Sequence, residues 1–160
     1  MLCIVQARMS STRLPGKGLE DVRGRPVLGR VVDRLRESSQ LGDVVVATSD
    51  EASDDPIEAF CREEGLEIAR GPLADVEQRF RDVVQAHDAD AFVRVSGDSP
   101  LIDPALIDRA IAYYRLSECD LVTNILQRKF PKGQWVEVIR SKTFLAIADG
   151  YMREEQREHV

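Results

Sequence analysis

The sequence predicts an α/β fold in which helices cover both faces of a mostly parallel β-sheet, a three-layer αβα arrangement. Short continuous apolar runs, typical of strands buried on both faces, alternate along the chain with segments whose apolar residues recur at helical spacing. Repeated strand–helix–strand units of this kind build parallel sheets. The 160 residues suffice for a hydrophobic core, so we expect a single domain over 1–160.

The individual elements follow from local patterns. Strands are predicted at 2–5, 43–48, 66–69, 91–95, 120–124 and 135–139, where apolar residues cluster. Helices are predicted to begin at Pro26, at Asp55–Pro56, at Val76 and at Pro104, and to cover 143–148. Proline is favoured in the first turn of a helix, and aspartate is favoured at the cap position, which we assign here to Asp55.

Four polar clusters, at 6–18, 48–50, 70–79 and 96–103, come at the ends of predicted strands. In an open α/β sheet the carboxyl ends of parallel strands share one edge, and ligands bind in the crevice at that edge. The sequence therefore predicts that the four clusters converge on one site.

The first cluster follows the first strand and reads QARMSSTRLPGKGL over 6–19. It combines the cations Arg8, Arg13 and Lys17 with small and hydroxyl residues. Small residues let backbone N–H groups approach phosphate oxygens, and cations neutralise their charge. We interpret it as a loop that binds the phosphates of a nucleotide, in preference to an ordinary basic surface loop. The order of residues is neither that of a Walker loop nor that of a dinucleotide-binding turn.

The cluster at 96–103 places Asp98 at the end of a predicted buried strand, beside Gly97. Mg²⁺ in proteins commonly takes one or two carboxylates and completes its shell with water and substrate phosphates. From the residues alone, a metal role for Asp98 and a role as the cap of the turn into Pro100 are equally good interpretations. Asp103, which precedes Pro104, is predicted to cap a helix.

Composition excludes several classes of protein. The net charge of −6 disfavours general nucleic-acid binding, and no apolar stretch approaches the roughly 20 residues that span a bilayer. The amino-terminal residues do not resemble a secretion signal, and Cys3, Cys61 and Cys119 are too scattered for a disulfide or metal framework. We therefore expect no nucleic-acid partner, no membrane partner and a cytoplasmic location.

The run R-x-x-S-T-R-L-P-G-K, which starts at Arg8, resembles the signature of cytidylyltransferases that make CMP-sugars, such as CMP-Kdo synthetase and acylneuraminate cytidylyltransferase. The chain is most similar to the spore coat polysaccharide biosynthesis protein F family. The stretch G-D-x-P-L-I-D from Gly97 is similar to the family's metal-binding segment, with Asp98 in the metal position. This resemblance implies a Rossmann-like nucleotide-diphospho-sugar transferase fold and Mg²⁺ as cofactor.

Three further stretches carry the resemblance. The segment R-G-x-x-x-D-V-x-x-R at 70–79 resembles one that lies beside the nucleotide in the family, and A-T-S at 47–49 resembles one that borders the base pocket. For Asp75 and Arg79, a helix cap with a solvated arginine is an equally good interpretation, and for Thr48 and Ser49 we slightly favour a plain polar strand end. Phe130 to Val138 resembles F-P-x-G-x-D-x-E-V on the sugar side, but Trp135 replaces the aspartate and is either a flat face for a sugar or a core residue.

The resemblance assigns roles as follows. Binding of the nucleotide falls to Gln6, Ala7, Arg8, Ser10, Ser11, Arg13, Lys17, Thr48, Ser49, Gly71, Asp75 and Arg79. Catalysis falls to Arg8, Arg13, Lys17 and Asp98, and binding of the sugar falls to Gly133, Trp135 and Glu137. The motif R-E-H-V at 157–160 also resembles the family, whose chains continue past it, so we expect 1–160 to lack the carboxyl-terminal part of the family domain.

The resemblance implies transfer of CMP from CTP to a sugar or sugar acid for surface polysaccharide, with release of pyrophosphate. Two alternatives stay open. A cationic loop after a first strand serves any nucleotide, so the chain could belong to another nucleotidyltransferase or a glycosyltransferase of the same fold. Trp135 and the short length also allow a non-catalytic binding or assembly module. A homodimer is expected by analogy only.

Overall fold

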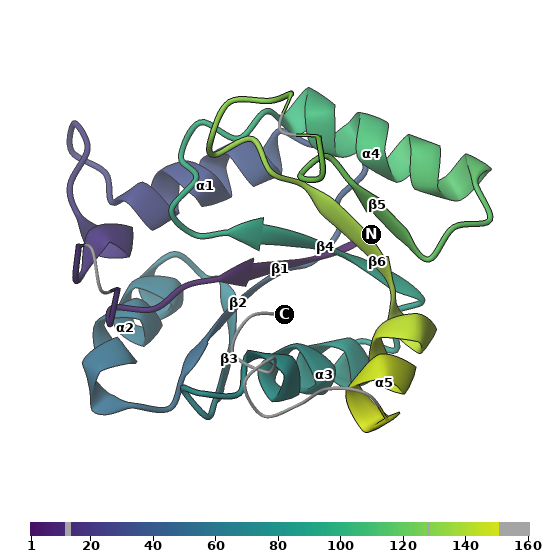
Figure 1. Ribbon diagram of the computed structural model, residues 1–160. Coiled ribbons are helices and arrows are strands. Elements are labelled where there is room, and N and C mark those ends of the chain that lie inside the picture. The colour runs from purple at the N-terminus through teal and green to yellow at the C-terminus, as the bar shows by residue number, and fades with distance from the viewer. Residues whose placement is uncertain (12–13, 128, 151–160) are drawn as a thin grey trace.

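The computed structural model describes residues 1–11, 14–127 and 129–150, with only the backbone of 148–150. Within this range the chain forms a six-stranded sheet in the order β3-β2-β1-β4-β6-β5 (Figure 1). The strands are β1 (Leu2–Gln6), β2 (Val44–Ser49), β3 (Glu67–Gly71), β4 (Ala91–Ser96), β5 (Leu121–Thr123) and β6 (Glu137–Arg140). Pairing is parallel among β1 to β4, and β6 runs antiparallel to both β4 and β5. The predicted mostly parallel sheet is confirmed.

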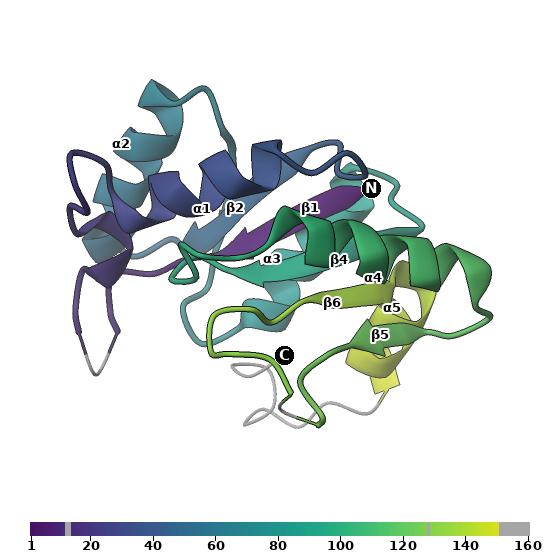
Figure 2. The same ribbon diagram turned by 90° about the horizontal axis from the view of Figure 1, so that it is seen from above.

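Helices cover both faces of the sheet, which confirms the three-layer architecture. They are α1 (Val27–Arg36), α2 (Asp55–Glu63), α3 (Val76–Ala86), α4 (Pro104–Leu116) and α5 (Ser141–Gly150). One hydrophobic cluster joins α1, α2 and α4 to one face of the sheet, and a second joins α3 and α5 to the other face. Figures 1 and 2 show α1 and α4 on the side opposite α3 and α5.

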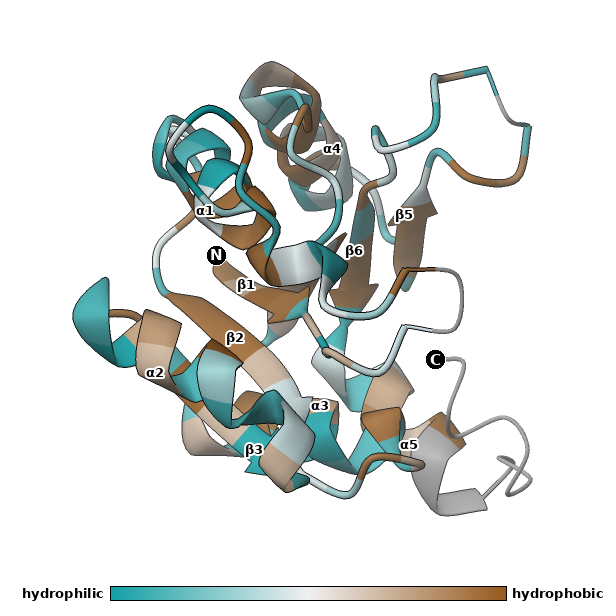
Figure 3. Ribbon diagram, turned by 90° about the vertical axis from the view of Figure 1, so that its left-hand side faces the viewer, coloured by the Kyte–Doolittle hydropathy of each residue, from teal (hydrophilic) through white to brown (hydrophobic). Residues whose placement is uncertain are grey.

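The apolar strands lie between these two layers of helices, and Figure 3 shows them as the hydrophobic centre of the molecule. Side chains of β1 alternate between the two clusters, with Cys3 and Val5 in one and Leu2 and Ile4 in the other. This alternation follows from the two-residue period of a strand. It explains why β1 reads as an unbroken apolar run: both of its faces are buried.

The register places the ends of the central strands side by side. Gln6, the last residue of β1, lies opposite Ala47 of β2 and Ser96 of β4. Because β6 runs antiparallel, its first residue, Glu137, reaches the same region and pairs with Arg94 of β4. The edge where β1 and β4 end therefore receives residues from three neighbouring strands.

Several element boundaries differ from the sequence prediction by one or two residues, among them the start of β6 and the cap of α2. The strand expected at 135–139 begins at Glu137, because Trp135 and Val136 still belong to the preceding loop, where Asn124 bonds the backbone of Gln134 and Val136. The assignment of Asp55 as a helix cap is wrong by one residue: Asp54 holds the cap position of α2, and Asp55 is its first residue. The caps predicted at Asp75 and Asp103 are confirmed by hydrogen bonds from the amides of Gln78 and Ala105, each 2.9 Å long.

No helix in the described ranges has the length and apolar character needed to cross a membrane. The apolar surroundings of Cys3, Cys61 and Cys119 in the sequence predict that all three are buried. This is confirmed for Cys3 and Cys61 and wrong for Cys119, which is partly exposed.

Candidate active site

A cleft of about 250 Å³ opens where β1 and β4 end, and we call it the β1–β4 cleft. Its lining consists of Gln6, Ala7, Arg8, Ser11, Lys17, Gly18, Ser96, Gly97 and Asp98. Six of these residues are predicted site residues from two clusters far apart in the sequence. The structure therefore brings the clusters at 6–18 and 96–103 together, as expected from the shared strand edge.

Close packing of two backbones shapes the floor of the cleft. The amide of Gly97 donates to the carbonyl of Gln6 over 2.8 Å, so the chain leaving β4 stays against the chain leaving β1. A side chain at position 97 would begin 3.0 Å from that carbonyl oxygen and 3.1 Å from the Cβ of Ala7. Only glycine fits here without displacing the backbone that carries Arg8.

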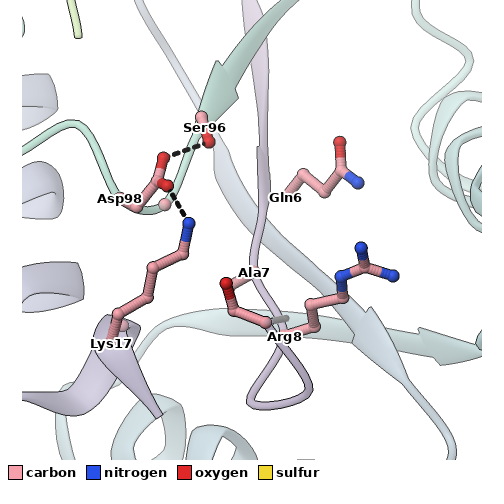
Figure 4. A pocket seen from close by; sticks show the side chains of 9 residues that line it. Gln6, Ala7, Arg8, Lys17, Ser96 and Asp98 are labelled. Carbon is pink, nitrogen blue, oxygen red and sulfur yellow. Dashed lines mark hydrogen bonds and ion pairs between the residues drawn. The ribbon is translucent and has the colours of Figure 1, made fainter. Parts of the chain in front are cut away.

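Lys17 and Asp98 form an ion pair on one wall of the cleft (Figure 4). The hydroxyl of Ser96 donates to the other carboxylate oxygen of Asp98 over 2.5 Å. Burial by itself raises the pKa of the Asp98 carboxyl, but the hydrogen bonds from Lys17 and Ser96, with the charge of Lys17, outweigh it and hold the pKa below its ordinary value. Asp98 is therefore an anion that already holds a cation.

The side chains of Gln6 and Arg8 point away from Lys17, toward the opposite side of the cleft (Figure 4). The guanidinium of Arg94 joins this side to β6, because it donates to the amide oxygen of Gln6 over 3.3 Å and to the carboxylate of Glu137 over 3.2 Å. Glu137, predicted on the sugar side, is thus linked to the cleft through Arg94. Arg94 itself was not among the predicted site residues.

Thr48 and Ser49 do not line the β1–β4 cleft. Both are fully buried, and their hydroxyls donate to the carboxylate of Asp54. Their side chains thus already have an acceptor inside the protein. This placement fits a polar strand end, the interpretation that the sequence slightly favours, better than direct contact with a base.

Gly71 and Arg79 pack against each other. A Cβ at position 71 would lie 2.8 Å from Cγ of Arg79, so the close approach that Gly71 allows is made by this side chain. Arg79 is 1% exposed, and in the described part of the chain none of its guanidinium nitrogens has a hydrogen-bond partner. The interpretation of Arg79 as a solvated arginine is therefore wrong. Its side chain is buried against Gly71 at the end of β3, where any larger residue would collide with it.

Gly133 and Trp135 lie on the loop between β5 and β6, which is fastened to the loop of Asp98. The side chain of Gln134 accepts a hydrogen bond from the amide of Asp103 over 3.0 Å and donates to the carbonyl of Leu101. Trp135 is 43% exposed, so the core alternative for this residue is wrong. Gly133 and Trp135 thus lie on a loop that contacts the loop after β4, which carries Asp98.

Some predicted residues fall elsewhere, and some lining residues were missed. Ser10 is exposed and does not line the cleft, while Arg13 and the R-E-H-V motif at 157–160 lie outside the described residues. Gly18, Ser96 and Gly97 line the cleft without having been predicted. Their position inside the clusters at 6–18 and 96–103 was the available signal.

A Mg²⁺ ion fits this site on chemical grounds. In the described part of the chain Asp98 is the carboxylate that lines the cleft. The same residues contain no cluster of three or more Asp, Glu, His or Cys side chains that could bind a metal without other ligands. Mg²⁺ commonly needs only one or two carboxylates when phosphates supply the remaining ligands. The ammonium of Lys17 already occupies Asp98 as a stand-in cation.

Comparison with known proteins agrees with the resemblance drawn from the motifs. A family model described as cytidylyltransferase matches residues 2–149. The spore coat polysaccharide biosynthesis protein SpsF of Bacillus subtilis (strain 168) is 36% identical over 165 residues, which cover 100% of this chain and 68% of SpsF. A 3-deoxy-manno-octulosonate cytidylyltransferase of Geobacter metallireducens is 38% identical over 109 residues, which cover 68% of this chain and 42% of that enzyme.

The fold agrees as well. The solved structure of a cytidylyltransferase from Leptospira borgpetersenii serovar Hardjo-bovis (strain JB197) superposes with a TM-score of 0.93 at 32% identity, over 98% of this chain and 67% of that one. The chain thus spans about two thirds of SpsF and of the Leptospira protein, and less than half of the Geobacter enzyme.

Proposed function

This chain belongs to the cytidylyltransferase family, and we propose that it takes part in the Mg²⁺-dependent transfer of CMP from CTP to a sugar or sugar acid that enters surface polysaccharide. The observation that carries the proposal is the β1–β4 cleft at the ends of two parallel strands, which Lys17 and Asp98 line on one wall and Arg8 lines on the other side. Cations and one carboxylate are what a metal–triphosphate complex requires.

In this reaction a hydroxyl oxygen of the acceptor attacks the α-phosphorus of CTP. The bond from that phosphorus to the bridging oxygen of the β-phosphate breaks, pyrophosphate leaves with the bonding electrons, and the hydroxyl proton passes to solvent. Such chemistry depends on positioning and charge neutralisation rather than on a covalent intermediate.

The residues of the cleft divide this work. Arg8 and Lys17 bind oxygens of the triphosphate, and Lys17 neutralises charge on the departing pyrophosphate. Asp98 would hold Mg²⁺, which when bound would neutralise phosphate charge and polarise the phosphoryl oxygen. Ser96 fixes the orientation of the Asp98 carboxylate through its 2.5 Å hydrogen bond. On the side of the cleft opposite Lys17, Glu137 supplies a hydrogen-bond acceptor for a sugar hydroxyl, and Trp135 supplies a flat apolar face for the sugar ring.

Thermal shift with CTP, UTP, GTP and ATP, each with and without Mg²⁺, tests the proposal. A ligand present at about 100 times its Kd stabilises the folded state by roughly 2.7 kcal/mol, which the melting temperature reports clearly. We expect a shift that is selective for CTP and larger with Mg²⁺. Pyrophosphate release in the presence of sugars and sugar acids then identifies the acceptor class. A shift of equal size with all four nucleotides, or with none, would contradict the proposal.

A further inference from the structure

Asp54 joins the end of β2 to the loop that carries the cations of the cleft. Its carboxylate is fully buried and accepts a hydrogen bond of 2.7 Å from the amide of Met9, which lies 45 residues away in the chain. The second carboxylate oxygen accepts from the hydroxyl of Thr48 and the amide of Ser49, each over 3.1 Å, and from the hydroxyl of Ser49. Four donors thus converge on one buried anion.

This arrangement does not serve the helix that Asp54 precedes. Asp54 stands at the N-cap position of α2, but its side chain makes no capping hydrogen bond there. Aspartate at this position usually stabilises its helix by accepting from an amide of the first turn. The carboxylate instead accepts hydrogen bonds from Met9 and from the end of β2. It therefore links two other segments of the chain and does not cap α2.

Met9 connects Asp54 to Arg8 and Lys17, the two cations that line the cleft in the described residues. Its carbonyl accepts hydrogen bonds from the amides of Ser11, over 2.9 Å, and Gly16, over 2.8 Å, so it closes the loop on itself. Arg8 directly precedes Met9, and Lys17 directly follows Gly16. Gly16 has φ of +75°, a conformation that glycine adopts without strain and that turns the chain toward Lys17.

A buried cation accompanies the buried anion. Burial lowers the pKa of the Arg79 guanidinium, and the negative charge of Asp54 is the largest opposing influence. The interaction between Asp54 and Arg79 is one of charge alone, because no hydrogen bond joins them in the described residues.

We propose that Asp54 is a positioning residue for the phosphate-binding loop: it fixes Met9 and, through Met9 and Gly16, sets the places of Arg8 and Lys17 in the β1–β4 cleft. The inference rests on the proposed function, because phosphate is the group that these cations would hold. Asp54 itself is fully buried and does not line the cleft.

The test compares Asp54→Asn with Asp55→Asn. The asparagine keeps the shape of Asp54 but turns an amino group toward donors that need an acceptor. The control changes the next residue, whose side chain is 63% exposed and pairs with Arg70 over 2.8 Å at the surface. Calorimetry measures the affinity of each folded protein for inorganic tripolyphosphate, and kinetics measures KM for CTP and for the acceptor.

We expect Asp54→Asn to weaken tripolyphosphate binding and to raise KM for CTP by about tenfold or more, because a hydrogen bond to a charged group is lost. KM for the acceptor should stay within about twofold, as should every parameter of Asp55→Asn. A purely structural role for Asp54 would lower the melting temperature but leave tripolyphosphate affinity of the folded protein unchanged, and that result would overturn the proposal.

Two further measurements keep the test decisive. If Asp54→Asn does not fold, Thr48→Val and Ser49→Ala each remove one donor to Asp54 and should each weaken tripolyphosphate binding by a smaller factor; unchanged affinity in both would refute the inference. Amide hydrogen exchange at Met9 and Gly16 should accelerate together in Asp54→Asn. Should the unmodified protein bind neither CTP nor tripolyphosphate, the proposed function fails, while the exchange rates still decide whether Asp54 fixes the loop.

Discussion

Lys17 donates to the carboxylate of Asp98 on one wall of the β1–β4 cleft, although 81 residues separate them in the chain. The pair joins the loop after β1 to the loop after β4, which are the two clusters that the sequence singles out. In this pair each side chain balances the charge of the other. Binding of a metal–triphosphate complex would give Lys17 a phosphate and Asp98 a metal in place of this contact.

Replacing Lys17 by alanine should therefore lower kcat for CMP transfer by about 100-fold or more, since removal of one preorganised charge-stabilising donor has effects of this size. The ion pair is about one-third exposed, so the free energy of unfolding should fall by less than about 1 kcal/mol. Pyrophosphate release and thermal denaturation measure the two effects. Lys142→Ala, an exposed lysine on α5, is the control. A loss of stability as large as that of a core variant, with turnover preserved, would contradict the assignment.

Asp98→Asn should separate metal dependence from nucleotide binding. The change removes the one negative charge that lines the cleft in the described residues, so CTP without Mg²⁺ should bind at least as well as to the unmodified protein. The additional stabilisation that Mg²⁺ gives in the presence of CTP should disappear. Thermal shift with CTP, with and without Mg²⁺, checks both statements; a metal increment that survives in Asp98→Asn would rule out Asp98 as the metal ligand.

Gly71→Ala should destabilise the protein by about 1 to 3 kcal/mol, the usual cost of overpacking. The added methyl group would lie 2.8 Å from the stem of Arg79, which cannot move freely because it is buried. In an Arg79→Ala background the same change should cost much less, because the obstructing side chain is gone. Urea denaturation of the four proteins of this cycle gives the coupling free energy. Equal costs in both backgrounds would show that Gly71 is needed for another reason. Gly18→Ala, with no atom within 4 Å of its added carbon, serves as the stability control.

The acid stability of the protein should depend on Glu64. Arg25 donates to both oxygens of this carboxylate, over 3.0 and 2.9 Å, and these hydrogen bonds hold the pKa of Glu64 below its ordinary value of 4.5. A lowered folded-state pKa contributes stability that is present above the ordinary value and is lost as the pH falls through the folded-state pKa. Glu64→Gln should thus be less stable than the unmodified protein at pH 7, and the difference should vanish in acid. Denaturation at a series of pH values measures it, and a constant difference would contradict the pKa assignment. Glu63→Gln, at an exposed neighbour, should show no such trend.

Much of the fold could be predicted because apolar spacing reports which faces are buried. The strands at β1, β2 and β4 and the helix starting at Pro104 match their predicted positions to within two residues. The direction of β6 could not be predicted in this way, since an apolar run reads the same whether it pairs parallel or antiparallel. Parallel neighbours are usually joined by a crossover helix, and the described residues between β5 and β6 contain no helix.

The convergence of Gln6, Arg8, Lys17 and Asp98 could be predicted because strand ends share an edge. The position of Asp54 behind this site could not be predicted from the sequence. It is one of four acidic residues between 50 and 55, and only the fold shows that its carboxylate faces Met9 while Asp55 faces solvent and Arg70. For the same reason the sequence identified Arg79 as a candidate without showing that it is buried.

The antiparallel course of β6 has a consequence for how such a protein can diversify. Residues of the β1–β4 cleft stand where their strands end, whereas Glu137 stands where its strand begins. The 13 residues between β5 and β6 can therefore be lengthened, shortened or exchanged without shifting the register of β1, β2 and β4, provided that the contact of Gln134 with the Asp98 loop is replaced. Under the proposed function, selection could then change the acceptor through this loop while the β1–β4 cleft is kept unaltered.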